Sequence, residues 1–419
     1  MNRNDIEIMA PAGSWESLHA AIKGGADSVY FGVEKLNMRA RSSHNFTTAD
    51  LPEIVALCRA NGLKSYLTLN IVVFDDEIRE MKEVLAAAAA AGITAVIATD
   101  QAAIMAAREA GLEVHLSTQL NISNSGAVKF YSEWADVVVL SRELNLQQVK
   151  TIHDSIVSDD IRGPGGELIK LEMFVHGALC MAVSGKCYLS LHEYNASANR
   201  GNCYQTCRRG YTVRDRETGY ELEIDNQYIM SPKDLCTIGF LDQLIGAGAR
   251  VLKIEGRARP PEYVETVVRC YGEAAAAVAG GTFGKEKVDG WMRELETVFN
   301  RGFWDGYYLG QRLGEWTTSY GSSATRRKML IGKVTNYFSR QGVAEIKLET
   351  GNITVGDELL ITGPTTGLVR HTVTELRDGN EKEALTVPRG EFCSVRLSET
   401  VRRSDKVFRW VEASDASKG

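Results

Sequence analysis

The 419-residue sequence has no apolar run long enough to cross a membrane. Its most apolar stretch, from Val84 to Ala98, contains Gly92 and Thr94 and is shorter than the roughly 20 residues that a membrane-spanning helix needs. The first residues, MNRNDIEIMAPAG, lack the apolar centre of a secretory signal. We therefore expect a cytoplasmic protein without membrane contact, whose clustered cysteines act as metal ligands rather than as disulfides.

The chain also lacks an excess of positive charge. It carries 48 Lys and Arg against 54 Asp and Glu, which gives a formal net charge of −6. This balance argues against a protein that holds nucleic acid by overall electrostatic attraction, so any RNA contact must be local. The 44% of hydrophobic and 24% of charged residues are typical of a folded chain, with room for one large and one smaller domain.

The eight cysteines are unevenly distributed, and four of them lie within one short segment. The four are Cys180, Cys187, Cys203 and Cys207, separated by six, fifteen and three residues. Thiolates are soft ligands, and four together can bind an iron–sulfur cluster or a structural zinc ion. Gly177, Gly185 and Gly201 lie beside them, where a chain that wraps around a metal centre needs positive φ. Four buried structural cysteines are the alternative, since free cysteine is often buried.

Short apolar runs alternate with segments of helical periodicity from residue 7 onward. The predicted strands are Ile6 to Met9, Ser28 to Phe31, Ser65 to Leu69, Ala95 to Ala98, Val114 to Leu116, Val137 to Leu140, Leu171 to Val175 and Val251 to Ile254. The helical segments include Ser14 to Gly24, Thr48 to Ala60, Asp75 to Ala91 and Asn145 to Asp154. Eight near-continuous apolar strands that alternate with helices predict an α/β fold of the (β/α)8 TIM-like barrel type, with an open doubly wound sheet as the alternative.

Polar residues follow several of these strands, and in a (β/α)8 barrel such positions line the active-site mouth. The candidates are Gln119, Arg142, His176, Lys253, Glu255 and Arg257. Lys253, Glu255 and Arg257 are spaced two apart, so they share one face of their strand. Three charges on a buried strand are costly unless they are paired or used, and a structural ring of ion pairs is the alternative to a binding site.

The alternation stops between the seventh and eighth predicted strands. Residues 177–228 carry the cysteines and then a polar, turn-rich stretch, which we interpret as an insertion at the barrel mouth. The clustered cysteines would then lie over the cavity, and Cys236, just after the insertion, is a candidate fifth thiol. Cys58, Cys270 and Cys393 lie in helical or strand patterns and are expected to be packing residues.

After residue 327 the pattern changes to short β-strands with turns, such as GKVTNYF, GVAEIKLE and GDELLITGP. The sequence therefore predicts two domains, namely the (β/α)8 barrel with its insertion at 1–327 and a small all-β barrel at 328–412. The segment GDELLITGP is similar to β-barrels that are appended to translation factors and to many RNA-modifying enzymes.

Ten spaced residues around the first two clustered cysteines match a family signature. They are Glu172, Phe174, Gly177, Ala178, Leu179, Cys180, Gly185, Cys187, Leu189 and Ser190. In spacing and identity they resemble the signature of peptidase family U32, the collagenase-like peptidases. Similar blocks extend the resemblance from residue 7 to about residue 257, namely MAPAGSWESLHAAIKGGADSVYFG, HLSTQLNISN, VVLSREL, MSPKDL and LKIEGR.

The resemblance implies an iron–sulfur protein of oxygen-independent hydroxylation, which acts on uridine in tRNA, cytidine in rRNA or a quinone precursor. It implies a cluster, expected to be 4Fe–4S, on the four clustered cysteines. Cys203 and Cys207 look like the tRNA branch and are preferred to Cys236. That branch implies prephenate as oxygen donor, tRNA as partner and 5-hydroxyuridine at the wobble position as product. Quinone-hydroxylating members stop near the end of the barrel, so the C-terminal domain favours a nucleic-acid substrate.

The strand-end residues would serve a small anionic co-substrate. Arg142 and Arg257 are expected to pair with its carboxylates, because a guanidinium group offers two parallel donors. The catalytic candidates are Lys253, Glu255 and His176, and the further substrate-binding candidates are Gln119 and Lys233. Whether the chain acts alone, as a homo-oligomer or with a paralogous partner stays open.

Three other functions also stay open. A peptidase would need an activated nucleophile or a catalytic zinc ion, and the sequence has neither an HExxH pair nor a GxSxG elbow. Cys180 and His176 could form a thiolate–imidazole pair, but a cysteine in a four-thiolate site is not free to attack a peptide. The other two functions are hydroxylation of rRNA and RNA binding by a metal-containing protein without catalysis.

Overall fold

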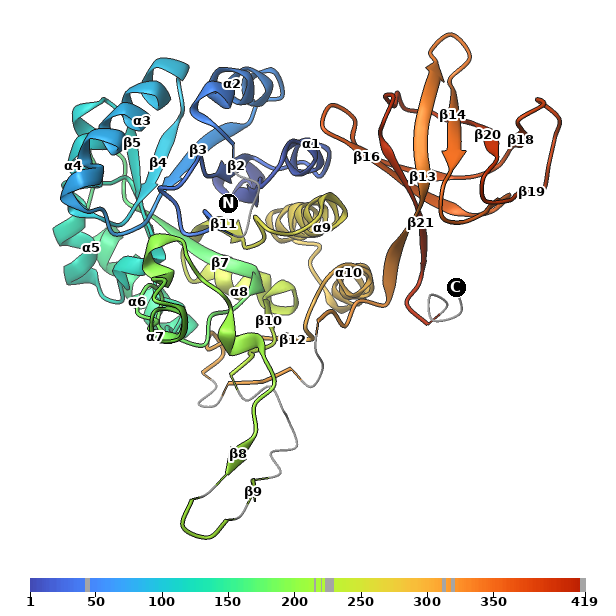
Figure 1. Cartoon of the computed structure of the whole chain (residues 1–419). Coiled ribbons are helices and arrows are strands. Elements are labelled where there is room, and N and C mark those ends of the chain that lie inside the picture. Colours follow the sequence, from blue (N-terminus) through green and yellow to red (C-terminus); the bar gives the residue numbers. More distant parts are fainter. Residues whose placement is uncertain are drawn as a thin grey trace.

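The computed structural model describes residues 1–41, 46–214, 216–219, 221–222, 230–310, 314–317 and 321–414. Within these residues, a parallel barrel ringed by helices is followed by an all-β domain (Figure 1). None of the described helices is both long and apolar enough to span a membrane. The predicted combination of a (β/α)8 barrel with a C-terminal β-domain is confirmed.

Eight parallel strands close the barrel in sequence order. They are β1 (Glu7–Pro11), β2 (Ser28–Phe31), β3 (Lys64–Leu69), β4 (Ala95–Ala98), β5 (Glu113–Leu116), β6 (Val137–Val139), β7 (Lys170–Ala178) and β11 (Ala249–Ile254). Because β11 pairs with both β7 and β1, the sheet has no free edge there. The open doubly wound sheet is thereby excluded.

Helices lie between successive strands and cover the outside of the barrel (Figure 1). They are α1 (Trp15–Lys23), α2 (Leu51–Ala60), α3 (Ile78–Ala91), α4 (Gln101–Glu109), α5 (Ser125–Tyr131), α6 (Leu146–Ser158), α8 (Leu241–Gly246) and α9 (Pro261–Ala279), followed by α10 (Lys285–Thr297). Polar caps start several of them. The Ser17 amide donates to Ser14 Oγ at 3.2 Å, and Asn145 forms a capping box with Gln148.

Apolar side chains fill both faces of the barrel strands. The inner cluster consists of Met9, Tyr30, Tyr66, Ala95, Ile97, Val137 and Val251. A larger cluster lies between the strands and the helices and includes Cys58 and Cys270. Burial on both faces explains why the strands read as continuous apolar runs.

The cysteine segment follows β7, which runs beyond the barrel. The end of β7 pairs antiparallel with β10 (Asp234–Cys236), and β10 pairs with β12 (Phe303–Trp304). Between β7 and β10 lie α7 (Leu189–Tyr194) and a two-stranded hairpin of β8 (Val213–Arg214) and β9 (Glu221–Leu222), which projects from the body (Figure 1). The inserted segment therefore returns to the barrel through a strand of its own. Residues 215, 220 and 223–228 of the predicted insertion lie outside the described residues.

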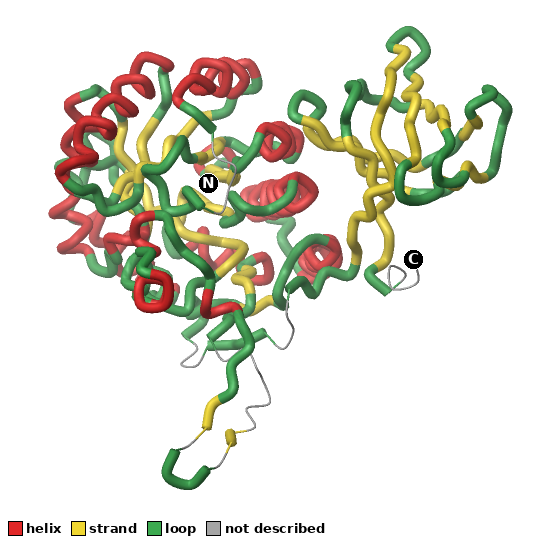
Figure 2. The backbone as a smooth tube through the Cα atoms, viewed as in Figure 1, coloured by secondary structure: helices red, strands yellow, loops and turns green. Residues whose placement is uncertain are grey.

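The C-terminal domain has a seven-stranded antiparallel sheet and a two-stranded one around its own core (Figure 2). Its strands are β13 (Arg326–Phe338), β14 (Val343–Leu348), β15 (Ile353–Thr354), β16 (Glu358–Gly363), β17 (Gly367–Thr372), β18 (Leu376–Asp378), β19 (Thr386–Val387), β20 (Phe392–Arg396) and β21 (Lys406–Glu412). Cys393 is buried in this core. The domain packs on α1 and α9, and Arg370 Nε binds Glu265 Oε2 at 2.8 Å across the contact.

Candidate functional site

A cavity of about 230 Å³ lies between the carboxyl ends of the barrel strands and the cysteine segment. Nine of the residues predicted from the sequence line it. They are Gln119, Arg142, Lys253, Glu255, Arg257, Cys180, Cys187, Cys203 and Cys207. Strand ends and the inserted segment therefore build one site, as expected for the mouth of a (β/α)8 barrel.

His176 and Lys233 lie outside the lining of this cavity, in contrast to their predicted roles. The pairing of β7 with β11 slips between Phe174 and His176, and this bulge reverses the alternation that would have placed both on one face. His176 is instead buried 5.5 Å from the Tyr271 ring, and burial, followed by the charge of Arg259, lowers its pKa to about 3. Lys233 forms a 2.6 Å ion pair with Glu315.

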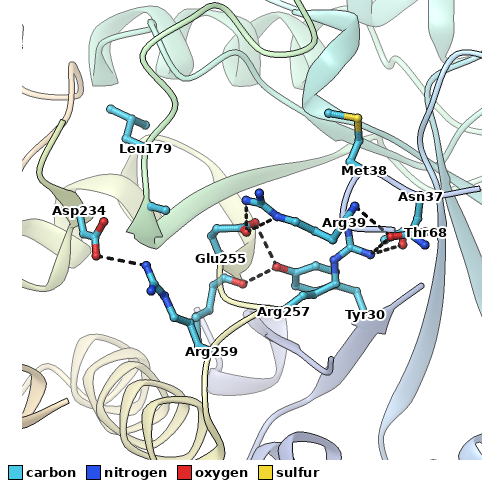
Figure 3. Close-up of polar contacts among 12 residues, drawn as sticks. Tyr30, Asn37, Met38, Arg39, Thr68, Leu179, Asp234, Glu255, Arg257 and Arg259 are labelled. Carbon is cyan, nitrogen blue, oxygen red and sulfur yellow. Dashed lines mark hydrogen bonds and ion pairs between the residues drawn. The ribbon is translucent and has the colours of Figure 1, made fainter. Parts of the chain in front are cut away.

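Glu255 is the acidic side chain among the described lining residues, and Arg39 holds it (Figure 3). Arg39 donates to Glu255 Oε1 through Nη2 at 2.7 Å and through Nε at 3.2 Å. Burial raises the pKa of Glu255, but the guanidinium groups of Arg39, Arg142 and Arg257 outweigh it and lower the pKa to about 2. Glu255 is therefore an anion at neutral pH.

Arg142 and Arg257 both have N–H groups without a hydrogen-bond partner. Arg257 Nη1 donates to Thr68 Oγ1 at 2.7 Å and to Asn37 Oδ1 at 3.0 Å (Figure 3). Arg142 Nη1 donates to the Ala178 carbonyl at 3.1 Å, and its guanidinium lies 3.8 Å from the Phe174 ring centroid. The Nε atoms of both arginines are buried without a hydrogen-bond partner. Burial lowers the pKa of Arg257 to about 10, so an anion beside it would relieve a desolvated charge.

Four more arginines, which no sequence pattern singled out, also line the cavity. They are Arg39, Arg208, Arg259 and Arg301. Arg259 could have been found, because it continues the two-residue spacing of Lys253, Glu255 and Arg257. Buried Asp234 holds Arg259 at 3.8 Å and Arg301 at 3.3 Å. Seven cations and one carboxylate thus line the cavity within the described residues.

Arg208 joins the cysteine segment to the rest of the site. Its guanidinium donates to the Leu179 carbonyl at 2.7 Å, to the Pro232 carbonyl at 2.6 Å and to Ser231 Oγ at 3.0 Å. The segment is therefore fastened beside Cys207 at both of its ends. Burial lowers the pKa of Arg208, which makes it a further desolvated cation.

The four clustered cysteines are free thiols within electrostatic range of one another. Burial raises the pKa of Cys207 to about 11, since it outweighs the opposing charge of Arg208, and the Cys180, Cys203 and Cys187 thiols add to the rise. Among the described residues, no three His, Cys, Asp or Glu side chains lie close enough together for a single metal ion. Cys236 does not line the cavity, because it is buried 3.8 Å from Met292 Sδ.

The positive φ predicted for the neighbouring glycines is present. Gly177, Gly185 and Gly201 have φ values of 102°, 72° and 81°. At Gly177 a Cβ atom would lie 2.4 Å from the Glu255 carbonyl oxygen, so only glycine lets β7 approach the end of β11 this closely. The cysteine segment depends on that approach for its place over the cavity.

Lys253, which lines the cavity, forms a buried ion pair with Glu172, which does not line it. Lys253 Nζ donates to Glu172 Oε1 at 2.6 Å, and Glu172 is fully buried. Glu172 Oε2 lies 3.7 Å from His115 Nδ1, and neither atom has a hydrogen-bond partner. Burial lowers the pKa of His115, but Glu113 and Glu172 outweigh it and raise the pKa to about 9.

Comparison with known proteins assigns the chain to a family. The family model described as peptidase family U32 matches residues 13–318. The chain belongs to peptidase family U32. The predicted resemblance is thereby confirmed.

Relatives within the U32 family carry different names. A protein of Porphyromonas gingivalis named collagenase is 62% identical over 98% of this chain and 99% of its own length. The tRNA hydroxylation protein P1 of Bacillus subtilis is 32% identical over 91% of this chain and 90% of its own length. A 23S rRNA 5-hydroxycytidine synthase of Escherichia coli is 33% identical over 74% of this chain and 46% of its own length. The U32 family therefore joins peptidase-named proteins to proteins that hydroxylate RNA.

Proposed function

We propose that this U32 protein catalyses iron–sulfur-dependent, oxygen-independent hydroxylation of RNA, with the wobble uridine of tRNA as target and prephenate as oxygen donor. One observation carries the proposal: four free thiols and seven cationic side chains line the same cavity at the barrel mouth. Relatives named as tRNA and rRNA hydroxylating proteins support the choice of RNA.

The four thiols fit an iron–sulfur cluster, because cysteine thiolates are the ligands that hold such clusters. Cys180, Cys187, Cys203 and Cys207 would hold it, and when bound it would supply one-electron chemistry beside the cavity.

The cationic side chains fit a small dianion. Prephenate has two carboxylates, and Arg142 and Arg257 each have a buried Nε–H without a partner. Glu255 is held as an anion by Arg39, so it limits the net charge that the occupant meets. An anion in this cavity would be bound through charge-assisted hydrogen bonds away from bulk water.

The deciding experiment is mass spectrometry of nucleosides from a strain that lacks this protein. Loss of 5-hydroxyuridine and its derivatives from tRNA, with restoration by the wild-type gene, supports the proposal. Loss of 5-hydroxycytidine from rRNA would instead support the rRNA alternative. An unchanged nucleoside profile would overturn RNA hydroxylation.

The RNA contact should be local, because the whole chain is acidic. We expect tRNA binding to weaken steeply between about 50 and 200 mM salt, as phosphate contacts by Lys and Arg require. Binding that does not respond to salt would contradict this expectation.

Peptidase activity is the second candidate, since a relative that is 62% identical is named collagenase. A thiol peptidase would need a basic imidazole near its cysteine. His176, the histidine that the sequence paired with Cys180, is buried, has a pKa lowered to about 3 and lies outside the cavity lining. Cleavage of unfolded collagen by the wild type, and not by a Cys180→Ala variant, would favour this candidate over hydroxylation.

A further inference from the structure

Lys253 is the lysine on the floor of the cavity, and its side chain is 6% exposed. Its Nζ lies 4.7 Å from the Tyr30 ring centroid and 5.5 Å from the Phe174 ring centroid. The amine is thus held between two aromatic rings and a buried carboxylate, Glu172. A lysine amine that is held in a fixed position beside a cavity can act as a nucleophile towards carbonyl substrates.

A purely structural ion pair does not account well for this arrangement. Strands β7 and β11 are already joined by backbone pairing on both sides of Lys253, at Leu252 with Met173 and at Ile254 with His176. A buried ion pair costs desolvation energy and is often no more stabilising than apolar residues of similar size. Glu172 Oε1 accepts a hydrogen bond from Lys253 Nζ at 2.6 Å, so this carboxylate is placed to take a proton from the amine.

Two arginines near Lys253 indicate which class of small molecule could react with it. The Arg142 guanidinium contacts the same Phe174 ring as Lys253, at 3.8 Å, and the Arg257 guanidinium lies 5.8 Å from the same Tyr30 ring. Arg142, Arg257 and Lys253 all line one cavity, so a carboxylate bound by either arginine would place an adjacent carbonyl carbon in the cavity that Lys253 lines. The chemical class with a carboxylate next to a ketone is the 2-oxo acid.

We propose that Lys253 forms an imine with the carbonyl carbon of a small 2-oxo acid. The Lys253 ammonium gives one proton to Glu172, and the free amine attacks the carbonyl carbon to form a C–N bond. A proton then moves from nitrogen to the former carbonyl oxygen. Glu172 returns its proton to the Lys253 nitrogen, from which a second proton moves to that oxygen, and the oxygen leaves as water while the protonated C=N bond forms. Hydrolysis reverses each step, and no oxidant or reductant is needed.

The imine goes beyond the proposed function in its covalent step, and it rests on that function only for the identity of the co-substrate. Prephenate carries a 2-oxo acid side chain, so the proposed donor has the required group. Covalent capture would fix the donor at the cavity floor while the barrel mouth receives RNA.

The test is reductive trapping on the full-length protein, purified without air, with pyruvate as the 2-oxo acid probe. Sodium borohydride reduces an imine to a stable secondary amine, and peptide mass spectrometry then locates it. We expect one pyruvate-dependent adduct on Lys253, and at least tenfold less on exposed lysines such as Lys285. Labelling of exposed lysines without labelling of Lys253 would overturn the proposal. So would a Lys253 adduct that forms equally in urea.

Matched variants keep this test informative. Lys253→Met alone leaves Glu172 buried without its partner and risks unfolding, so the double variant Lys253→Met/Glu172→Gln is the folded control that must lose the adduct. Arg142→Leu should raise the pyruvate concentration for half-maximal trapping at least tenfold. Because trapping needs no RNA, a Lys253 adduct with an unchanged nucleoside profile would refute hydroxylation but not the imine. Absence of the Lys253 adduct, together with loss of the modified nucleoside in the strain that lacks the protein, would refute the imine alone.

Discussion

Replacing Arg142 with leucine should weaken binding of a small dianion without unfolding the protein. The protein itself uses little of this guanidinium, which makes one 3.1 Å hydrogen bond to the Ala178 carbonyl and stacks on Phe174. Loss of one hydrogen bond and one cation–π contact costs about 1–3 kcal/mol of unfolding free energy. A stable domain has about 5–15 kcal/mol, so Arg142→Leu should remain folded.

The effect on binding should be larger than the effect on the fold. A hydrogen bond to a charged group contributes about 1.5–3 kcal/mol, which corresponds to a roughly 10- to 150-fold rise in Kd. Isothermal titration of prephenate into wild type and Arg142→Leu measures this rise, and Tm reports folding. Arg142→Lys keeps the charge and loses the planar fork, so it should give an intermediate Kd.

The matched control is Arg79→Leu, since Arg79 is 91% exposed and pairs only with Glu83 one helical turn away. Its Kd should equal that of the wild type. A Kd for Arg142→Leu within twofold of the wild type would refute the role of Arg142 in anion binding. Absence of prephenate binding to the wild type would refute prephenate as the donor.

Three further predictions concern the cysteines, the backbone and pH. Cys187→Ser should remove most iron and acid-labile sulfide from protein purified without air, whereas Cys236→Ser should retain both, as metal analysis would show. Gly177→Ala should lower the free energy of unfolding by about 3 kcal/mol or more, because φ at Gly177 is 102° and the added Cβ would meet a backbone oxygen. Gly272 lies inside α9 with open space around it, so Gly272→Ala should raise the free energy of unfolding by about 0.5–1 kcal/mol. Denaturant titrations of both variants measure these changes. The pKa of Glu255 is lowered to about 2 in the folded state, so its contribution to stability is complete above about pH 4.5 and is lost as pH falls towards 2. Acid titrations should show this loss in the wild type and not in Glu255→Gln.

The barrel could be predicted because its periodic signals are local. Each strand is buried on both faces, so its apolar run is visible in the sequence alone, and caps such as Ser14 mark where a helix begins. The exit of β7 from the barrel could not be predicted in the same way. It depends on pairing with β10, which lies more than fifty residues later in the chain, and on a bulge at His176 that reverses the side-chain alternation.

The site was predictable where its residues share one strand and hidden where they converge from loops. The alternation of Lys253, Glu255 and Arg257 placed all three in the cavity, as strand periodicity requires. Arg39 and Arg301 lie far from that strand in sequence, and no local pattern distinguishes them from ordinary surface arginines. Their role becomes visible only through their acidic partners, Glu255 and Asp234.

The cavity concentrates positive charge in a protein whose net charge is negative. Arg257, Arg208 and Arg259 all have pKa values lowered by burial, which means that the fold holds cations where water solvates them poorly. Self-repulsion among such groups is unfavourable unless anions join them, and Glu255 in the described lining, with Asp234 and Glu172 behind it, supplies fewer negative charges than the seven cations carry. The thiolates of a metal centre and the carboxylates of a co-substrate are anionic, and both would relieve this repulsion. The same arrangement therefore accounts for the cysteines and the arginines together, which neither a structural thiol cluster nor a structural ring of ion pairs does.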